Sequence, residues 1–252
     1  MSAALADVEA VIHSAGIAHA MSGVPEDDYR VLNTEASVRL ARAAQRAGAK
    51  RFIFLSSIRA QSGPTADDVL REAHPPQPTD AYGRSKLAAE QGLAEVDLDW
   101  AALRLVVVYG PGVKGNMEEL LRVARSPYPL PLGSLTAKRS ILSLENLAAA
   151  IDTVLTTPDR LRRPFIVADP EPVTIPQMIA IMRSALGRRP ALVPVPHRLL
   201  KLTLRAAGRG EIYSRLTGSL VVDPSALLQL GWTPPVTTAE ALRAFARSSQ
   251  NA

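Results

Sequence analysis

A tyrosine and a lysine lie four residues apart in the segment "DAYGRSKLAAEQGL", which covers residues 80–93. If this segment is helical, Tyr82 and Lys86 are one turn apart and both side chains can point the same way. Such a pair can act as an acid and a base, because a nearby ammonium group favours the phenolate form of tyrosine. The competing interpretation is a surface tyrosine beside a solvated lysine, since Y-x-x-x-K arises often by chance. The rest of the chain has to decide between the two.

The composition narrows the classes of protein and of site. The 252 residues, 47% of them hydrophobic, suffice for one large domain or for a domain with a smaller lobe. The chain has no cysteine, which excludes disulfides, thiolate catalysis and cysteine-ligated metal. Its apolar runs are short and residues 1–20 lack the pattern of a signal peptide, so we expect a soluble cytoplasmic protein without a membrane partner.

The formal charge of +5 raises the question of nucleic acid binding. The basic residues are scattered, with "RLRRP" and "GRRP" as short clusters that are typical of loops. Aromatic residues make up only 4% of the chain, too few for platforms on which bases stack. We therefore expect no nucleic acid partner, but a solvated surface with some preference for anionic ligands.

Strands and helices are predicted to alternate along the first part of the chain. Short apolar runs indicate buried strands, whereas apolar residues at helical spacing, closed by Gly48, indicate the first helix. The predicted order is strand 8–16, helix 27–48, strand 50–57, the helix that holds Tyr82, and strand 100–110. This alternation is typical of an α/β fold in which helices cover both faces of a parallel sheet.

The chain changes character from about residue 112. Most of the prolines lie there, as in "SPYPLPLGS" and "RRPALVPVPH", and they separate short elements. We interpret residues 1–111 as the main domain and residues 112–252 mainly as a smaller substrate-binding lobe. Residues 139–169 are expected to return to the main sheet.

Several motifs occur together in a meaningful order. They are "VIHSAG", "VLNTEASVRLARAAQRAGAKRFIFLSS", "AYGRSK", "LRLVVVYGPG", "RSILSLENLAAAI" and, near the end, "RLTGSLVVD" with "LGWTPPVTTAEAL". Over about residues 5–245 the chain resembles the extended short-chain dehydrogenase/reductase family. Within it, the resemblance is to the NAD-dependent epimerase/dehydratase group that acts on nucleotide sugars, including 4-epimerases and UDP-N-acetylquinovosamine dehydrogenases. It implies a Rossmann-like doubly wound parallel sheet with a small C-terminal substrate lobe.

The resemblance also implies a catalytic set. In this family a tyrosine exchanges a proton with the sugar 4-hydroxyl, while NAD exchanges a hydride with the sugar. Tyr82 matches the tyrosine, and Lys86 with the positive nicotinamide ring is expected to lower its pKa from about 10. Ser57 matches the hydroxyl that bonds the reacting oxygen. The neighbouring Ser56 is expected to have a structural role.

Further residues match binding positions of the family. The resemblance assigns Ala15, Gly16 and Asn33 to the cofactor, together with Tyr82 and Lys86. It assigns Arg59, Asn116, Arg139 and Arg215 to the nucleotide-sugar substrate. Two departures concern the sugar: Val107 replaces a frequent asparagine, and Arg59 stands where many relatives have a small hydroxyl residue.

The family's first glycine-rich motif does not occur in these residues. Neither G-x-x-G-x-x-G nor G-x-G-x-x-G opens a helix, and the match begins at the family's fourth strand. We therefore expect an N-terminally truncated sheet, short of roughly 50–60 residues or two β-α units. The exposed edge strand would then invite pairing with another chain. NAD, or NADP, should bind this chain weakly or not at all.

Three classes of function remain open. The first is an NAD(P)-dependent nucleotide-sugar oxidoreductase or epimerase that acts at C4 of a UDP-sugar, as a homodimer. Dehydratase activity is disfavoured, because "IRAQ" after Ser57 lacks an Asp-Glu pair. The second is a catalytically silent relative that binds nucleotide sugars or serves as a scaffold. The third is an RNA- or cofactor-binding regulator, which the Ser57, Tyr82 and Lys86 set disfavours.

Overall fold

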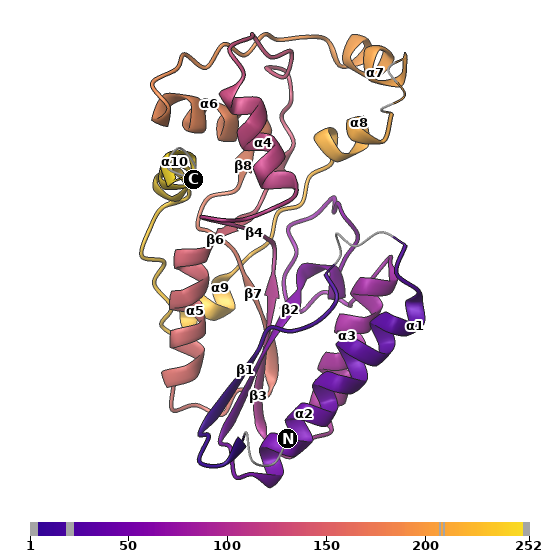
Figure 1. Ribbon diagram of the computed structural model, residues 1–252, viewed down its shortest axis with the longest axis vertical. Helices are drawn as coiled ribbons and strands as arrows, with labels where there is room; N and C mark the ends of the chain where they lie inside the picture. Colours follow the sequence, from indigo (N-terminus) through magenta and orange to yellow (C-terminus); the bar gives the residue numbers. More distant parts are fainter. Residues whose placement is uncertain (1–4, 19–22, 207, 209, 249–252) are drawn as a thin grey trace.

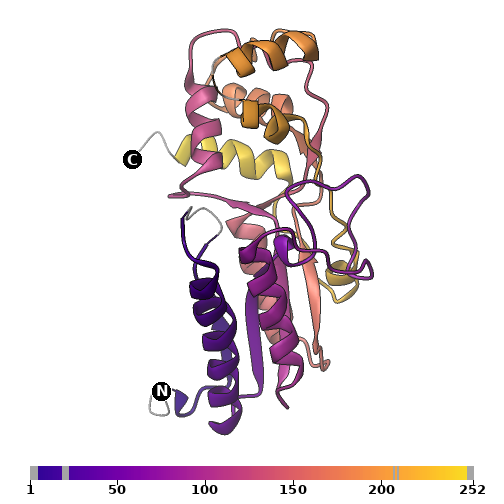
Figure 2. The same ribbon diagram turned by 90° about the vertical axis from the view of Figure 1, so that its right-hand side faces the viewer.

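The computed structural model describes residues 5–18, 23–206, 208 and 210–248. Figures 1 and 2 show an elongated molecule with two parts along its long axis. One part, the body, is built around a parallel sheet, and the other, the distal lobe, is built from short helices and strands. The predicted catalytic residues Ser57, Tyr82 and Lys86 lie in the body, on the side of the distal lobe.

The sheet of the body has four parallel strands in the order β1-β2-β3-β7. These strands span Ala10–His13, Arg51–Ser57, Asp99–Leu105 and Arg163–Val167. The inner strands β2 and β3 are buried along most of their length, which explains their nearly continuous apolar sequence. Because the strands are parallel, their carboxyl ends meet at one edge, and this edge faces the distal lobe (Figure 1).

Helices cover both faces of the sheet, as the alternating pattern predicts. Alanines of α2 and α3 pack against Phe52 and Phe54 on one face, and the second face is buried under α5 and α9 with Trp232. These helices span Ala36–Arg46 (α2), Ala81–Ala94 (α3), Leu144–Thr156 (α5) and Ser225–Gln229 (α9). The body therefore has the layered structure of an α/β protein.

The strand expected over residues 100–110 is interrupted. β3 ends at Leu105, and β4 (Val107–Tyr109) pairs with β6 (Ile141–Ser143) in a separate small sheet. The intervening Val106 is buried. A single apolar run thus serves two sheets, and the break lies where the chain passes from the body to the distal lobe.

The helix expected over residues 27–48 is continuous but irregular. It begins with α1 (Glu26–Tyr29), continues through the π-helical segment η2 (Arg30–Glu35) and ends with α2 at Arg46. A π-helical segment widens a helix by an extra residue in the turn and is frequent at functional sites. Here it contains Asn33, which is fully buried.

The distal lobe has its own apolar core. Met117, Leu121, Ile179, Leu242 and Phe245 are among the buried residues that form it. Its helices are α4 (Asn116–Arg125), α6 (Ile175–Ala185), α7 (His197–Ala206), α8 (Gly210–Thr217) and α10 (Thr238–Ser248). Its further strands are β5 (Lys138–Arg139) and β8 (Val173–Thr174), which pair with each other. Within the described part of the chain, no helix has the length and apolar character that crossing a bilayer requires.

Candidate active site

Tyr82 and Ser57 meet at the carboxyl edge of the sheet. Ser57 is the last residue of β2, and Tyr82 lies in the first turn of α3. The two side chains are hydrogen-bonded to each other. The Ser57 Oγ also accepts the backbone N–H of Arg59 at 3.2 Å, so its own hydrogen is available to the phenol oxygen. Ser57 thus caps the following turn, η3 (Ile58–Ala60), and contacts the candidate catalytic tyrosine.

Lys86 lies one turn after Tyr82, on the face of α3 that covers the sheet. Its ammonium is 5.9 Å from the ring centroid of Tyr82 and 4.5 Å from that of Phe54, and it donates to the carbonyl of Leu55 at 2.9 Å. Burial lowers the pKa of Lys86 to about 8, although the Glu90 carboxylate opposes this change. The side chain is therefore a buried cation beside the phenol.

The protein groups alone raise the pKa of Tyr82, and the lower pKa expected from Lys86 together with the nicotinamide ring stays a prediction. Burial raises this pKa above its ordinary value, and the hydrogen bond from Ser57 opposes the rise. Asp80 adds to the rise, whereas Arg59 acts against it. The reason is that a phenolate loses solvation in this environment, while the nearby charges of Asp80 and Arg59 act in opposite directions.

A buried polar network lies directly behind these residues. The Ser56 Oγ donates to Glu90 at 2.6 Å, and the Arg104 guanidinium bonds both oxygens of Glu90, the shortest contact being 2.7 Å. Arg104 also donates to Gln61 at 2.8 Å. All four side chains are nearly inaccessible to solvent. The network links β2, α3 and β3 immediately beside Ser57 and Lys86, which agrees with a structural role for Ser56.

The loop after β1 approaches the same place. Gly16 has a φ of +153°, and a Cβ at this position would lie 2.6 Å from the Asn33 Oδ1 and 3.8 Å from the Lys86 Nζ. Asn33 fixes the loop, because its Oδ1 accepts the N–H of Ile17 at 2.7 Å and its Nδ2 donates to the Ser85 Oγ at 3.1 Å. Because the Asn33 oxygen leaves no room for a Cβ, this position requires glycine, and its backbone lies close to Lys86. The neighbouring Ala15 is exposed on this loop.

Arg59 joins the turn that follows Ser57 to the helix that holds Tyr82. Its guanidinium forms an ion pair with Asp80, whose second oxygen caps α3 by accepting the N–H of Gly83 at 2.7 Å. The Nε and Nη1 of Arg59 are buried and have no hydrogen-bond partner within the described residues. A Cβ on Gly83 would lie 2.2 Å from the Arg59 carbonyl oxygen, so the turn and the helix are in close contact.

The other predicted substrate residues lie in the distal lobe, away from this cluster in the sequence. Asn116 is exposed at the start of α4, directly after Gly115. Arg139 lies in β5, and burial lowers its pKa. Arg215 belongs to α8, and its side chain lies outside the described residues. Val107 is partly exposed on β4, where the chain enters the lobe.

Comparison with known proteins identifies the family. The sequence matches the model of the NAD dependent epimerase/dehydratase family over residues 1–168. A UDP-glucose 4-epimerase of Vibrio cholerae is 36% identical over 254 aligned residues, which cover 97% of this chain and 77% of that protein. The chain belongs to the NAD dependent epimerase/dehydratase family. The family resemblance and the enzyme class expected from the sequence are thereby confirmed.

Solved structures confirm the fold. MoeE5 in complex with UDP-glucose and NAD has a TM-score of 0.75 and 23% identity, covering 99% of this chain and 82% of that one. The UDP-glucuronic acid 4-epimerase of Bacillus cereus, in complex with NAD, has a TM-score of 0.76 and 17% identity, covering 99% and 77%. At these identities the likeness concerns the fold, which is the Rossmann-like α/β fold of epimerases.

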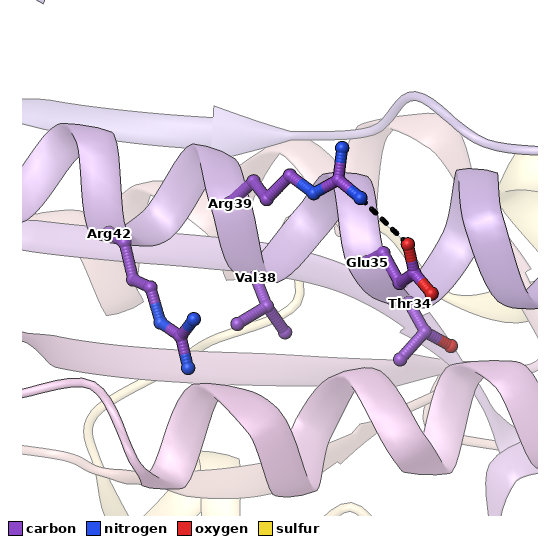
Figure 3. Close-up of a pocket in the computed structure, with 5 residues that line it drawn as sticks. All are labelled: Thr34, Glu35, Val38, Arg39 and Arg42. Carbon is purple, nitrogen blue, oxygen red and sulfur yellow. Dashed lines mark hydrogen bonds and ion pairs between the residues drawn. The ribbon is translucent and has the colours of Figure 1, made fainter.

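A surface hollow of about 240 Å³ lies beside η2 and α2 of this epimerase/dehydratase family member (Figure 3). It is lined by Thr34, Glu35, Val38, Arg39 and Arg42. Arg39 points to Glu35 and donates to it at 2.8 Å. An exposed ion pair of this kind contributes little to stability. We interpret the hollow as a solvated surface of the helix.

Sequence reasoning did not find the partners that position the family's catalytic set. Glu90 and Arg104 are 14 residues apart on different elements, and nothing in the local pattern pairs them. Asp80 directly precedes the predicted helix, and Asp at this position is a common N-cap. That signal could have identified the cap, but not the ion pair with Arg59.

Proposed function

We propose that this protein is a nucleotide-sugar oxidoreductase or epimerase that acts at C4 of a UDP-sugar, with Tyr82 as the acid and base. The observation that carries this proposal is the convergence of Ser57, Tyr82 and Lys86 at the carboxyl edge of the sheet. Ligands of open parallel sheets bind at this edge. Membership in a nucleotide-sugar family and the relation to a UDP-glucose 4-epimerase support the choice of substrate.

Each of the three side chains has one task. The Tyr82 oxygen takes the proton of the sugar 4-hydroxyl and later returns it. Ser57 donates a hydrogen bond to the reacting sugar oxygen and stabilises that oxygen while its charge changes. Lys86 places a positive charge 5.9 Å from the centroid of the Tyr82 ring, and it keeps this charge below a pH of about 8; we propose that this charge favours the phenolate during proton transfer.

The cofactor that we propose is NAD, with NADP as an alternative. NAD, when bound, accepts and returns the hydride of C4. The residues at Gly16 fit its nicotinamide side, because the backbone there lies close to Lys86 and leaves no room for a Cβ. The 252 residues contain no glycine-rich turn before a helix to bind a pyrophosphate, so we propose that these residues alone bind NAD weakly.

Arg59 is proposed to contact the sugar. Its buried Nε and Nη1 have no acceptor within the described part of the protein and lie beside Tyr82, so a substrate oxygen would satisfy them. We further propose that Asn116, Arg139 and Arg215 bind the diphosphate from the distal lobe. Guanidinium groups suit this task, since their fork matches phosphate oxygens.

The test is to incubate the 252-residue protein with UDP-glucose and NAD and to follow formation of the C4 epimer and of NADH. Binding of UDP is measured separately by calorimetry. Epimer or NADH that depends on Tyr82 supports the proposal. UDP binding without either product, at millimolar NAD, would instead support the catalytically silent binding relative.

Two further properties belong to this proposal. We propose that the enzyme acts in the cytoplasm and forms a homodimer. Size-exclusion chromatography with light scattering tests the dimer, because a mass near 27 kDa would contradict it.

A further inference from the structure

The positive charge of the protein is concentrated in one segment. Residues 186–210 contain six of the 29 Lys and Arg residues and none of the 24 Asp and Glu residues. The rest of the chain therefore carries 23 basic and 24 acidic residues and is nearly neutral. The net positive charge of the chain is therefore that of residues 186–210, most of which lie at the far end of the distal lobe.

The described residues of this segment form the tip of the molecule together with the loop 126–135. The backbone of Leu130 bonds Ala191 and Val193 at 2.9 and 2.8 Å, and His197 bonds the carbonyl of Ser134 at 3.1 Å. Figures 1 and 2 show α7 and the chain leading to it at the end opposite the body's N-terminal strand ends. Hydrogen bonds therefore join the two loops to each other, although they are far apart in the sequence.

A buried arginine fixes these loops. The Arg183 guanidinium is inaccessible to solvent and donates to the carbonyls of Ser126, Tyr128 and Pro190 at 3.0, 2.9 and 2.8 Å. As a result, Tyr128, which is 72% exposed, is presented on a rigid support. A single exposed aromatic residue is not by itself an interaction surface, but it becomes part of one where further exposed apolar residues adjoin it.

The surface of α7 carries two parallel stripes. Leu199 and Leu202 are one turn apart and 50% and 65% exposed, whereas Leu200 on the opposite face is buried. The second stripe, at the same spacing, consists of the exposed residues Arg198, Lys201 and Arg205. A helix with exposed leucines beside a row of cations fits an interface that offers an apolar layer next to an anionic layer.

We propose that this surface, the basic tip, docks on the anionic surface of a lipid bilayer. The basic tip consists of the exposed residues Tyr128, Arg188, Arg189, Val193, Arg198, Leu199, Lys201, Leu202 and Arg205. The leucines enter the headgroup region and the cations bind lipid phosphates. This contact is peripheral, and it revises the expectation of no membrane partner without requiring a membrane-spanning helix. The proposal is independent of the proposed reaction.

Charge complementarity selects this occupant over the others. A nucleic acid would use the cations but would leave Leu199 and Leu202 in water, since its backbone offers no apolar surface. A second copy of the chain offers little opposite charge, because the remaining residues are nearly neutral in sum. An anionic bilayer uses both stripes at the same time.

The test is cosedimentation of the protein with vesicles of phosphatidylcholine alone or with an equal amount of phosphatidylglycerol. We expect binding only to the anionic vesicles, and its loss in high salt. Each basic residue near such a surface contributes about fivefold in affinity, so the variant R198Q/K201Q/R205Q should bind at least about tenfold more weakly. L199Q/L202Q should also weaken binding.

The matched control is R39Q/R42Q/R46Q, which removes the same charge from exposed positions of α2. It should change vesicle binding by less than about twofold, because α2 lies on the body. Equal losses in the two triple variants would overturn the basic tip and leave only an effect of net charge. The proposal would also be overturned if the unmodified protein did not bind anionic vesicles. The same holds if single-stranded RNA, at a nucleotide concentration below the lipid concentration, displaced the protein from the vesicles.

A second measurement does not depend on the folding of a triple variant. Because the chain has no cysteine, Leu202→Cys can be labelled uniquely with an environment-sensitive dye. Anionic vesicles should shift its emission to the blue, whereas the same dye on Arg46→Cys of α2 should not respond. An unchanged emission at position 202 in the presence of bound protein means that another surface makes the contact.

Discussion

The body and the tip of the distal lobe differ in which side chains are buried and which are exposed to solvent. In the body, Ser56, Glu90, Arg104 and Gln61 are buried, and each has a hydrogen-bond partner. At the tip, leucines are exposed and cations lie together without an acidic residue in their segment. A buried, fully bonded network holds side chains at fixed distances, as proton transfer requires. An exposed mixture of leucine and cations is suited to contact with something else.

The largest expected effect is on turnover, in the body. Tyr82→Phe should reduce the rate of epimerisation by about 10²–10⁴-fold, because the phenol oxygen is the proposed site of proton transfer. UDP binding should remain within about threefold, since the proposed diphosphate contacts lie in the distal lobe. Steady-state rates and calorimetry on the variant measure the two effects separately.

Tyr29→Phe is the matched control. Tyr29 is also buried, and its ring contacts that of Tyr82 edge-on with 6.2 Å between centroids. Removal of its hydroxyl should leave most of the turnover. If both variants lose turnover equally, the loss reports packing of the two rings and not proton transfer by Tyr82.

The second prediction breaks the network of the body. Glu90→Gln leaves the Arg104 guanidinium buried without its counter-charge, which should lower the free energy of unfolding by about 3–5 kcal/mol. Asp97→Asn removes an exposed partner of Arg160 and should cost less than about 1 kcal/mol. Urea denaturation of both variants makes the comparison. Similar midpoints would show that the buried pair is not specially coupled to folding.

The sequence predicted the frame of the site better than its interior. The strand and helix alternation follows from apolar periodicity, and Tyr82 and Lys86 share a helical face because of their spacing. The ion pair between Glu90 and Arg104 is a contact between separate elements, which no local pattern specifies. The break between β3 and β4 at Val106 could not be predicted either, because a single apolar run can pair first with one sheet and then with another.

The rise that the protein groups cause in the Tyr82 pKa could not be predicted from spacing, because it depends on burial. Spacing alone indicates that a cation is near, and this favours the phenolate. The structure adds the loss of solvation and the opposing effect of Asp80, and these prevail. The catalytic and binding roles of the named residues remain predictions, although Ser57, Tyr82, Lys86 and Gly16 lie at one edge of the sheet.

The third prediction concerns Lys86 and pH. Its pKa in the folded protein is about 8, below the value of 10.5 that it regains on unfolding. Between these pH values the unfolded chain binds the proton and the folded protein does not, so unfolding is increasingly disfavoured as the pH rises. Below about pH 8 both states bind it, and the cost of the buried ammonium is fully present.

Relative to Lys86→Met, the unmodified protein should therefore gain about 1–3 kcal/mol in its free energy of unfolding from pH 8 to 10.5. Urea midpoints at several pH values measure this gain. Lys114→Met, at an exposed loop position, is the control and should follow the unmodified protein. A constant difference across the range would mean that Lys86 is solvated in the folded state.

The smallest expected effect lies at the tip. Leu202 is 65% exposed, so Leu202→Gln should change the free energy of unfolding by less than about 0.5 kcal/mol. Leu103 lies in the middle of β3 with no exposed surface, and Leu103→Ala should cost about 2–5 kcal/mol. The same urea experiment measures both. A large loss for Leu202→Gln would mean that this leucine packs within the protein, and it would then be unavailable for contact with a bilayer.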